Sequence, residues 1–137
     1  MIVVLDVNII ISALIKDSIT REILAKSELD FYFPEPSMQK IRKYKSYIQE
    51  KTGLNELDFF KLFHSLLSFI KIIPTEDLMK HWENAKEIME HIDPEDVTII
   101  ATALSQEEAI IWSDDNHFEK QNSVKTLKTK EMIELLE

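Results

Sequence analysis

Short apolar runs alternate with longer amphipathic segments along almost the whole sequence, and no other feature constrains the fold as strongly. The first run, Ile2–Leu5, is continuous and mainly β-branched, which is typical of a parallel strand covered on both faces. We predict strands at residues 2–5, 31–33, 69–73, 109–112 and 124–127. Strands separated by helices in this order predict the α/β class, as a three-layer αβα sandwich around a central parallel sheet.

Capping residues set the expected ends of the helices. We expect helices at residues 9–16, 18–26, 37–51, 55–68, 75–91, 93–105 and from 129 onward. The expected N-caps are Ser18, Ser37, Thr75, Asp93 and Thr129, and Gly53 is the expected stop after residue 52. Helical spacing places Tyr44 in the core, together with a stripe of Phe60, Phe63, Leu66 and Leu67 that is also a candidate dimer contact.

Composition excludes several kinds of site. The 137 residues suit one domain, spanning 1–137. The sequence has no cysteine, which excludes disulfides and thiolate metal sites, and its single glycine, Gly53, excludes a glycine-rich phosphate loop. No stretch approaches the roughly 20 apolar residues of a membrane-spanning helix, and no basic segment precedes the apolar start. We therefore expect a cytoplasmic protein that does not enter membranes.

The charge balance limits how this chain could bind nucleic acid. Lys and Arg total 16 and Asp and Glu total 25, a net charge of −9. The overall field therefore repels phosphates, and binding requires a local basic patch or a bridging metal. The candidate patch is the run Lys40, Arg42, Lys43, Lys45 and Lys51. Lys40 and Lys43 are its candidate substrate-binding residues, and a solvated helix face is the commoner reading of such a run.

Acidic residues gather at three points in the sequence. The strand 2–5 ends in Asp6-Val7-Asn8, and the strand 109–112 is followed by Ser113-Asp114-Asp115. Ligands of open α/β sheets bind outside the carboxyl ends of the strands, so these two clusters should share one edge. A third cluster, containing Asp96, opens a helix. We expect it near the opposite edge unless that helix is tilted, although one helical turn would bring Asp96 inward.

Grouped carboxylates repel one another, and a divalent cation relieves the repulsion. Mg²⁺ and Mn²⁺ both accept such oxygen ligands, and a bound metal activates water and clamps a phosphodiester. The acids thus indicate phosphoryl chemistry. Each also has a structural alternative: Asp6 as a cap, Asp96 as a partner of the helix dipole, and Asp115 as part of a turn.

Three motifs in this order resemble the PIN-domain family. The first is the strand Ile2-Val3-Val4-Leu5-Asp6-Val7-Asn8. The second is the helix start Asp96-Val97-Thr98-Ile99-Ile100-Ala101-Thr102-Ala103-Leu104, and the third is Ser113-Asp114-Asp115-Asn116-His117-Phe118. The resemblance extends over nearly the whole chain.

The resemblance implies a metal-dependent ribonuclease that acts on RNA with Mg²⁺ or Mn²⁺. By motif position, Asp6, Asp96 and Asp115 would be the catalytic metal ligands. Asn8 would orient Asp6 or a metal-bound water, and Ser113 would support the site. The family also includes toxins neutralised by a small protein, so the resemblance implies an antitoxin-like partner and a homodimer as expectations.

Two positions depart from the family pattern. The family's second acid, expected early in the helix after the second strand, falls on Gln39 or Lys40, and Glu35 could replace it only if its loop bends inward. The second Asp of the later motif is His117, which lies near the proposed site and could bind a metal or a phosphate, although a loop histidine without a role is the commoner reading. Fewer carboxylates predict weaker metal binding.

Three functional hypotheses follow. The first is a metal-dependent endoribonuclease built on Asp6, Asp96 and Asp115. The second is a catalytically silent module that binds RNA or a protein through the basic helix. The third is a receiver-like phosphoaspartyl switch at Asp6, which would require a second acid where Asn8 stands.

Overall fold

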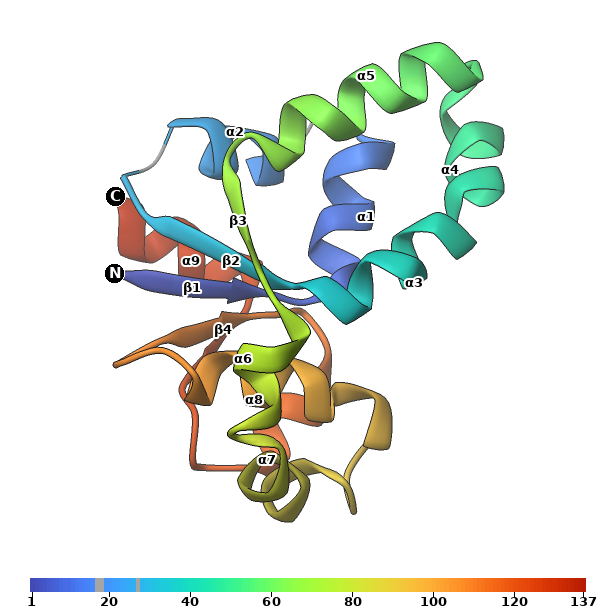
Figure 1. Ribbon diagram of the computed structural model, residues 1–137. Coiled ribbons are helices and arrows are strands. Elements are labelled where there is room, and N and C mark those ends of the chain that lie inside the picture. Colours follow the sequence, from blue (N-terminus) through green and yellow to red (C-terminus); the bar gives the residue numbers. More distant parts are fainter. Residues whose placement is uncertain (17–18, 27) are drawn as a thin grey trace.

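The computed structural model describes residues 1–16, 19–26 and 28–137, and its centre is a five-stranded sheet in which every pairing is parallel (Figure 1). The strands are β1 (Ile2–Leu5), β2 (Asp30–Pro34), β3 (Ile70–Ile73), β4 (Ile110–Trp112) and β5 (Thr126–Leu127). Their order is β3-β2-β1-β4-β5, which places β1 in the middle. The predicted α/β class with a central parallel sheet is confirmed.

Helices cover both faces of this sheet, which gives the expected three layers (Figure 1). The α-helices are α1 (Val7–Ile15), α2 (Ile19–Lys26), α3 (Met38–Lys43), α4 (Lys45–Thr52), α5 (Glu56–Leu67), α6 (Thr75–Met79), α7 (Trp82–Met89), α8 (Val97–Leu104) and α9 (Thr129–Leu136). Short 3₁₀ turns, η1 (Glu35–Ser37), η2 (Pro94–Asp96) and η3 (Asn116–Lys120), join some of them. In the described residues, no helix combines the length and the apolar character needed to cross a lipid bilayer.

Alternation along the strands divides the core into two halves. Val3 and Leu5 of β1 join the core beneath α1, α2 and α5, whereas Val4 between them joins the core beneath α7 and α8. Successive strand residues point to opposite faces, so a strand covered on both sides must be apolar throughout. This is why the continuous run Ile2–Leu5 forms the central strand.

The predicted helix over residues 37–51 is wrong in one respect, because it is broken into α3 and α4 at Tyr44. The predicted cap Ser37 makes no capping hydrogen bond, and Tyr44 is 46% exposed rather than packed inward. Ile41 and Ile48, one on each helix, are fully buried. Both helices contact α1, and the break lets each of them place its isoleucine against the same core.

The predicted helix over residues 75–91 is also divided, into α6 and α7. Its predicted cap Thr75 is the first helical residue, and Pro74 holds the N-cap position without a side-chain hydrogen bond. The break at His81 lets Leu78 on α6 and Met89 on α7 both reach the core, where each is almost completely buried.

Other helix predictions have mixed outcomes. Gly53 ends α4 in a left-handed conformation (φ 73°), as expected of a glycine stop. Phe60, expected in the core, is 50% exposed, and its neighbour Phe59 is buried instead. The predicted N-cap Thr129 is also wrong: Lys128 holds that position and Thr129 begins α9. The predicted cap Ser18 lies outside the described residues.

Candidate metal centre

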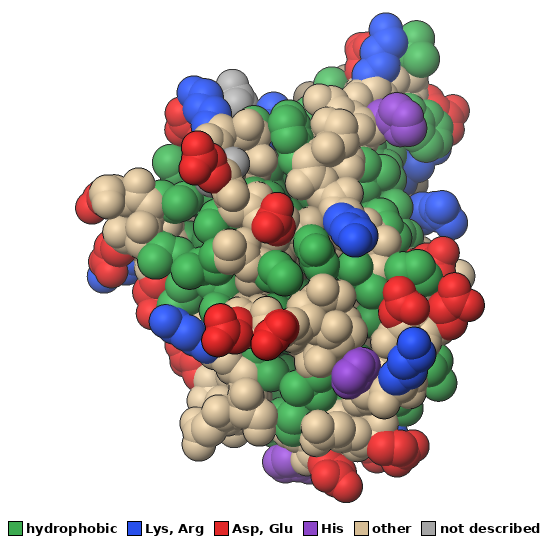
Figure 2. Space-filling model, turned by 60° about the vertical axis from the view of Figure 1, so that its left-hand side comes forward, with side chains coloured by type: hydrophobic (Ala, Val, Ile, Leu, Met, Phe, Trp, Pro, Cys, Tyr) green, Lys and Arg blue, Asp and Glu red, His purple; other side chains and the backbone are tan. Residues whose placement is uncertain are grey.

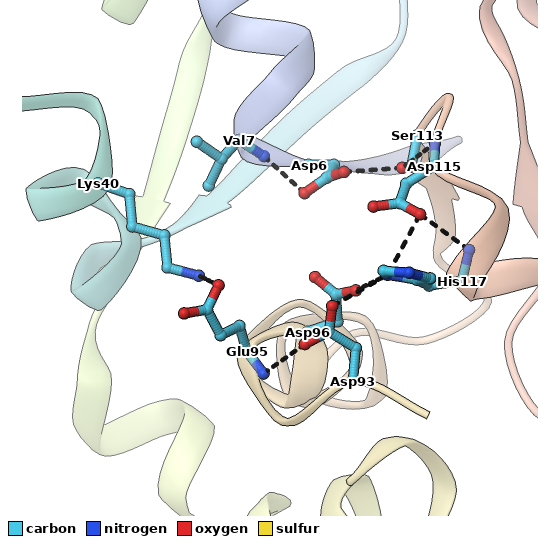
Figure 3. Close-up of polar contacts among 9 residues, drawn as sticks. All are labelled: Asp6, Val7, Lys40, Asp93, Glu95, Asp96, Ser113, Asp115 and His117. Carbon is cyan, nitrogen blue, oxygen red and sulfur yellow. Dashed lines mark hydrogen bonds and ion pairs between the residues drawn. The ribbon is translucent and has the colours of Figure 1, made fainter. Parts of the chain in front are cut away.

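Carboxylates from three distant segments meet at the carboxyl ends of β1 and β4 (Figure 3). Asp6 follows β1, Asp115 follows β4, and Asp96 ends η2 directly before α8. The expectation that the helix-start cluster lies near the opposite edge is wrong. The helix α8 leads directly into the parallel strand β4, so it must end at the amino edge of the sheet and begin at the carboxyl edge. Asp96 therefore needs no tilt of the helix to reach the site.

Asp6 is buried and held by two hydrogen bonds. Its Oδ1 accepts the backbone N–H of Val7 at 2.8 Å, and its Oδ2 accepts the hydroxyl of Ser113 at 2.7 Å. Burial raises the pKa of Asp6, with the charge of Asp115 adding to the rise, while the two hydrogen bonds and Lys40 oppose it. The hydrogen bonds that orient Asp6 come from Val7 and Ser113, and none comes from Asn8, which is exposed in the first turn of α1.

Ser113 connects Asp6 to the loop that carries Asp115. Its Oγ donates to Asp6 and accepts the backbone N–H of Asp115 at 3.0 Å. Asp115 in turn accepts the backbone N–H of His117 at 2.9 Å through Oδ1. This arrangement fixes the start of η3 and turns Asp115 toward Asp6, whose pKa its charge raises.

Asp96 is the most strongly perturbed acid of the site. Its pKa is raised to about 7, first by burial and then by the charges of Asp6, Asp93 and Asp115, with His117 opposing the rise. The residue is 9% exposed, and its Oδ2 has no hydrogen-bond partner among the described residues. A buried carboxylate oxygen without a donor is unfavourable in the metal-free protein.

The structure adds Asp93, which was expected only as a helix cap, and it brings His117, whose role as a ligand was the less favoured reading, into the cluster. Nδ1 of His117 lies 2.9 Å from Oδ2 of Asp93, 3.2 Å from Oδ1 of Asp115 and 3.5 Å from Oδ2 of Asp96. Asp93 also performs its predicted capping role, because its Oδ1 accepts the N–H of Glu95 at 3.0 Å. Its second oxygen faces the site (Figure 3). The spacing of Asp93 and Asp96, three residues apart at a helix start, is the signal that could have indicated a shared face.

The remaining candidates lie around this cluster. Nζ of Lys40 on α3 lies 3.8 Å from Oε2 of Glu95, the neighbour of Asp96 in sequence, and its charge lowers the pKa of Asp6 (Figure 3). Lys43, on the next turn of α3, is exposed, as is Gln39. Glu35 does not replace the family's second acid: its Oε1 accepts both the N–H and the hydroxyl of Thr75, each at 3.1 Å, at the start of α6.

These residues fit a divalent cation. One ligand atom each from Asp93, Asp96 and His117 lie within 4.8 Å of one another. Two of the atoms in this space, Oδ2 of Asp96 and Nδ1 of His117, are buried without a hydrogen bond among the described residues, so both remain available as ligands. Carboxylate oxygens with one imidazole are donors that a divalent metal accepts.

Comparison with known proteins gives one family. A family model for the PIN domain matches residues 4–137, a span that includes every residue of the site described above. No curated protein matches the chain.

Proposed function

The chain belongs to the PIN-domain family, and on that premise we propose that it is a metal-dependent endoribonuclease that hydrolyses RNA phosphodiesters. The observation that carries the proposal is the convergence of Asp6, Asp96 and Asp115 at one edge of the sheet, where Asp115 raises the pKa of both other acids. In a protein that bound no cation at this point, a larger separation of these carboxylates would increase the stability of the fold.

Asp6, Asp96 and Asp115 would hold the cation. When bound, the cation would lower the pKa of a water molecule and neutralise charge on the phosphodiester. Ser113 and the N–H of Val7 keep Asp6 in one orientation, so its oxygens need little reordering to act as ligands. The charge of Lys40 lies close enough to Asp6 to lower its pKa, so its ammonium group would contact a phosphate bound at the centre, and the exposed Lys43 would extend the positive charge along α3.

The test is the rate of cleavage of a labelled RNA by the Asp6→Asn protein in Mg²⁺ or Mn²⁺. The substitution removes a charge from the centre and preserves the size of the side chain, so we expect cleavage to fall to the level measured with excess chelator. The matched control is Asp58→Asn, an exposed acid on α5, which should cleave at the wild-type rate. Equal cleavage by the Asp6→Asn and wild-type proteins would refute the proposal.

The alternative is a catalytically silent module that binds RNA or a protein partner. It is favoured by Gln39 and Lys40, which stand where the family has its second acid. Calorimetric titration with Mn²⁺ distinguishes the two, because a silent module has no need of a metal. Tight binding that is lost in the Asp6→Asn protein would count against the alternative.

A further inference from the structure

We propose that His117 and Asp93 are ligands of this centre, and that the imidazole of His117 shifts its preference from Mg²⁺ toward first-row transition ions such as Zn²⁺. The inference rests on the proposed function, because both involve the same cation. What it adds is the identity of the ion and the atoms that bind it. Motif position assigns Asp6, Asp96 and Asp115 as ligands. Asp93 matches no acid of the motifs, and His117 replaces one of them.

Distances place the imidazole nitrogen among the carboxylates rather than beside them. Nδ1 of His117 faces three acids at 2.9 to 3.5 Å, and it is buried although 41% of the side chain is exposed. The exposed part of the ring is therefore directed away from the cluster and its nitrogen into it (Figure 3). A surface histidine without a role would have no reason to bury that atom.

The atoms that fix the loops are different from the atoms that face the site. Asp93 anchors η2 through Oδ1 and turns Oδ2 toward His117. His117 is anchored through its backbone N–H, which leaves the ring unconstrained by that bond. Asp96 provides the independent indication of a ligand, since it is 9% exposed and its Oδ2 points into the cluster without a hydrogen bond among the described residues.

The chemistry of the donor atoms sets the preference. An unprotonated imidazole nitrogen is a good ligand for zinc and iron, whereas Mg²⁺ is bound mainly by carboxylates and water. His117 stands where the family motif has an acid, so the replacement exchanges a hard oxygen donor for a nitrogen donor. A centre with this nitrogen should discriminate against Mg²⁺ more strongly than the same centre with oxygen donors alone.

The first experiment uses the unaltered protein. Zn²⁺ is added to wild-type protein labelled with ¹⁵N-histidine, and the ring nitrogens are followed by NMR. We expect Nδ1 of His117 to shift on binding, while the rings of His64, His81 and His91, which lie outside the cluster, keep their positions. An unchanged Nδ1 of His117 at saturating Zn²⁺ would overturn the proposal.

The second experiment compares affinities for Zn²⁺ and Mg²⁺ by calorimetry in the absence of RNA. Removing a residue that only hydrogen-bonds to a metal ligand lowers metal affinity by about 10–100-fold. Replacing His117, a proposed ligand, with Asp should therefore lower the ratio of Zn²⁺ to Mg²⁺ affinity by about tenfold or more. Asp93→Asn should weaken both ions, and the control His64→Ala should change neither. A ratio that is the same in the wild-type and His117→Asp proteins would contradict the inference.

The two proposals fail separately. If Asp6-dependent RNA cleavage is observed and the affinity ratio does not respond to His117→Asp, the inference about His117 falls and the nuclease stands. If the ratio responds and RNA is not cleaved, the nuclease falls and the mixed nitrogen–oxygen centre stands.

Discussion

Among the acids of the site, Asp96 has the most strongly raised pKa. Its pKa is raised to about 7 from an ordinary value of 3.8, mainly because it is buried and then because Asp6, Asp93 and Asp115 surround it. Between these two pH values the folded chain holds a proton that the unfolded chain has released. The free energy of unfolding of the metal-free protein therefore falls as the pH rises from about 4 to about 7.

Replacing Asp96 with Asn should remove this pH dependence. In excess chelator at pH 8, we expect Asp96→Asn to be more stable than the wild-type protein by about 1–3 kcal/mol, since the variant buries no charge at position 96. Near pH 3.5 the two proteins should be close to equally stable. Urea denaturation at both pH values measures the difference, and a gap between the two proteins that does not grow with pH would contradict the assignment.

Ser113 should contribute to stability as well as to orientation. Ser113→Ala leaves Oδ2 of Asp6 and the N–H of Asp115 without their hydroxyl partner, so we expect a loss of about 1–3 kcal/mol in the free energy of unfolding. Urea denaturation at neutral pH provides the measurement. Ser46→Ala, on the exposed surface of α4, is the matched control and should change stability by less than about 0.5 kcal/mol.

The sequence predicted the convergence of Asp6 and Asp115, because acids that follow parallel strands share one edge. The position of Asp93 in the site was not predicted, because its capping role already accounts for an acid at the start of η2. Capping uses only one carboxylate oxygen, and the structure shows that the other faces His117. A ligand role for His117 was the less favoured reading, because no spacing of histidines suggested one. Apart from Asp115, its neighbours in the site are Asp93 and Asp96, which are too distant in sequence for a local pattern to show.

At the scale of elements, α9 is attached to the sheet through Thr129. Its hydroxyl accepts the indole N–H of the buried Trp112 at 2.9 Å and donates to Oδ2 of Asp114 at 2.7 Å. Oδ1 of Asp114 accepts the N–H of Thr129 at 2.8 Å, which satisfies a free donor at the helix start. One loop thus positions the site with Asp115 and the last helix with Asp114.

Thr129→Val should weaken this attachment. The valine has the shape of threonine without its hydroxyl, so the N–H of Trp112 is left unpaired and we expect a loss of about 1–3 kcal/mol in stability. Tryptophan fluorescence during urea denaturation measures the change. If the midpoint and slope of the transition match those of the wild-type protein, the hydrogen bond contributes nothing.

Strands were easier to predict than helices. Four of the five predicted strands lie within one residue of the structure at each end, because β-branched or aromatic runs bounded by proline or polar residues leave little choice. The fifth, predicted over residues 124–127, is the shorter β5. The breaks at Tyr44 and His81 could not be read from the sequence, since helix-forming residues continue through both. Each break is set by tertiary packing that the local pattern does not contain.

At the scale of the whole molecule, a net charge of −9 means that any field favourable to RNA must be local. On the face shown in Figure 2, lysine and arginine side chains are scattered among acidic and apolar ones rather than gathered in one patch. Under the proposed function, the cation would therefore contribute to RNA binding as well as to chemistry.

Metal binding should stabilise the entire fold, because the ligands come from both ends of the chain. At a free concentration about 100 times the dissociation constant, a cation that binds only the folded state adds about 2.7 kcal/mol. Thermal unfolding with and without Mn²⁺ measures this shift, which should be reversed by chelator. The Asp6→Asn protein should show a much smaller shift, and an equal shift in both would locate the binding elsewhere.

The pairing of β1 with β4 also determines when the cluster of acids can form. Ser113, which holds Asp6 in place, is synthesised 107 positions after it. At about 5–20 residues per second, a ribosome needs roughly 5–20 s to cover that interval. Throughout this time the nascent polypeptide has its first acid but lacks the strand and loop that complete the cluster. Under the proposed nuclease function, a growing chain would therefore emerge beside the messenger RNA that encodes it before it could cut that RNA.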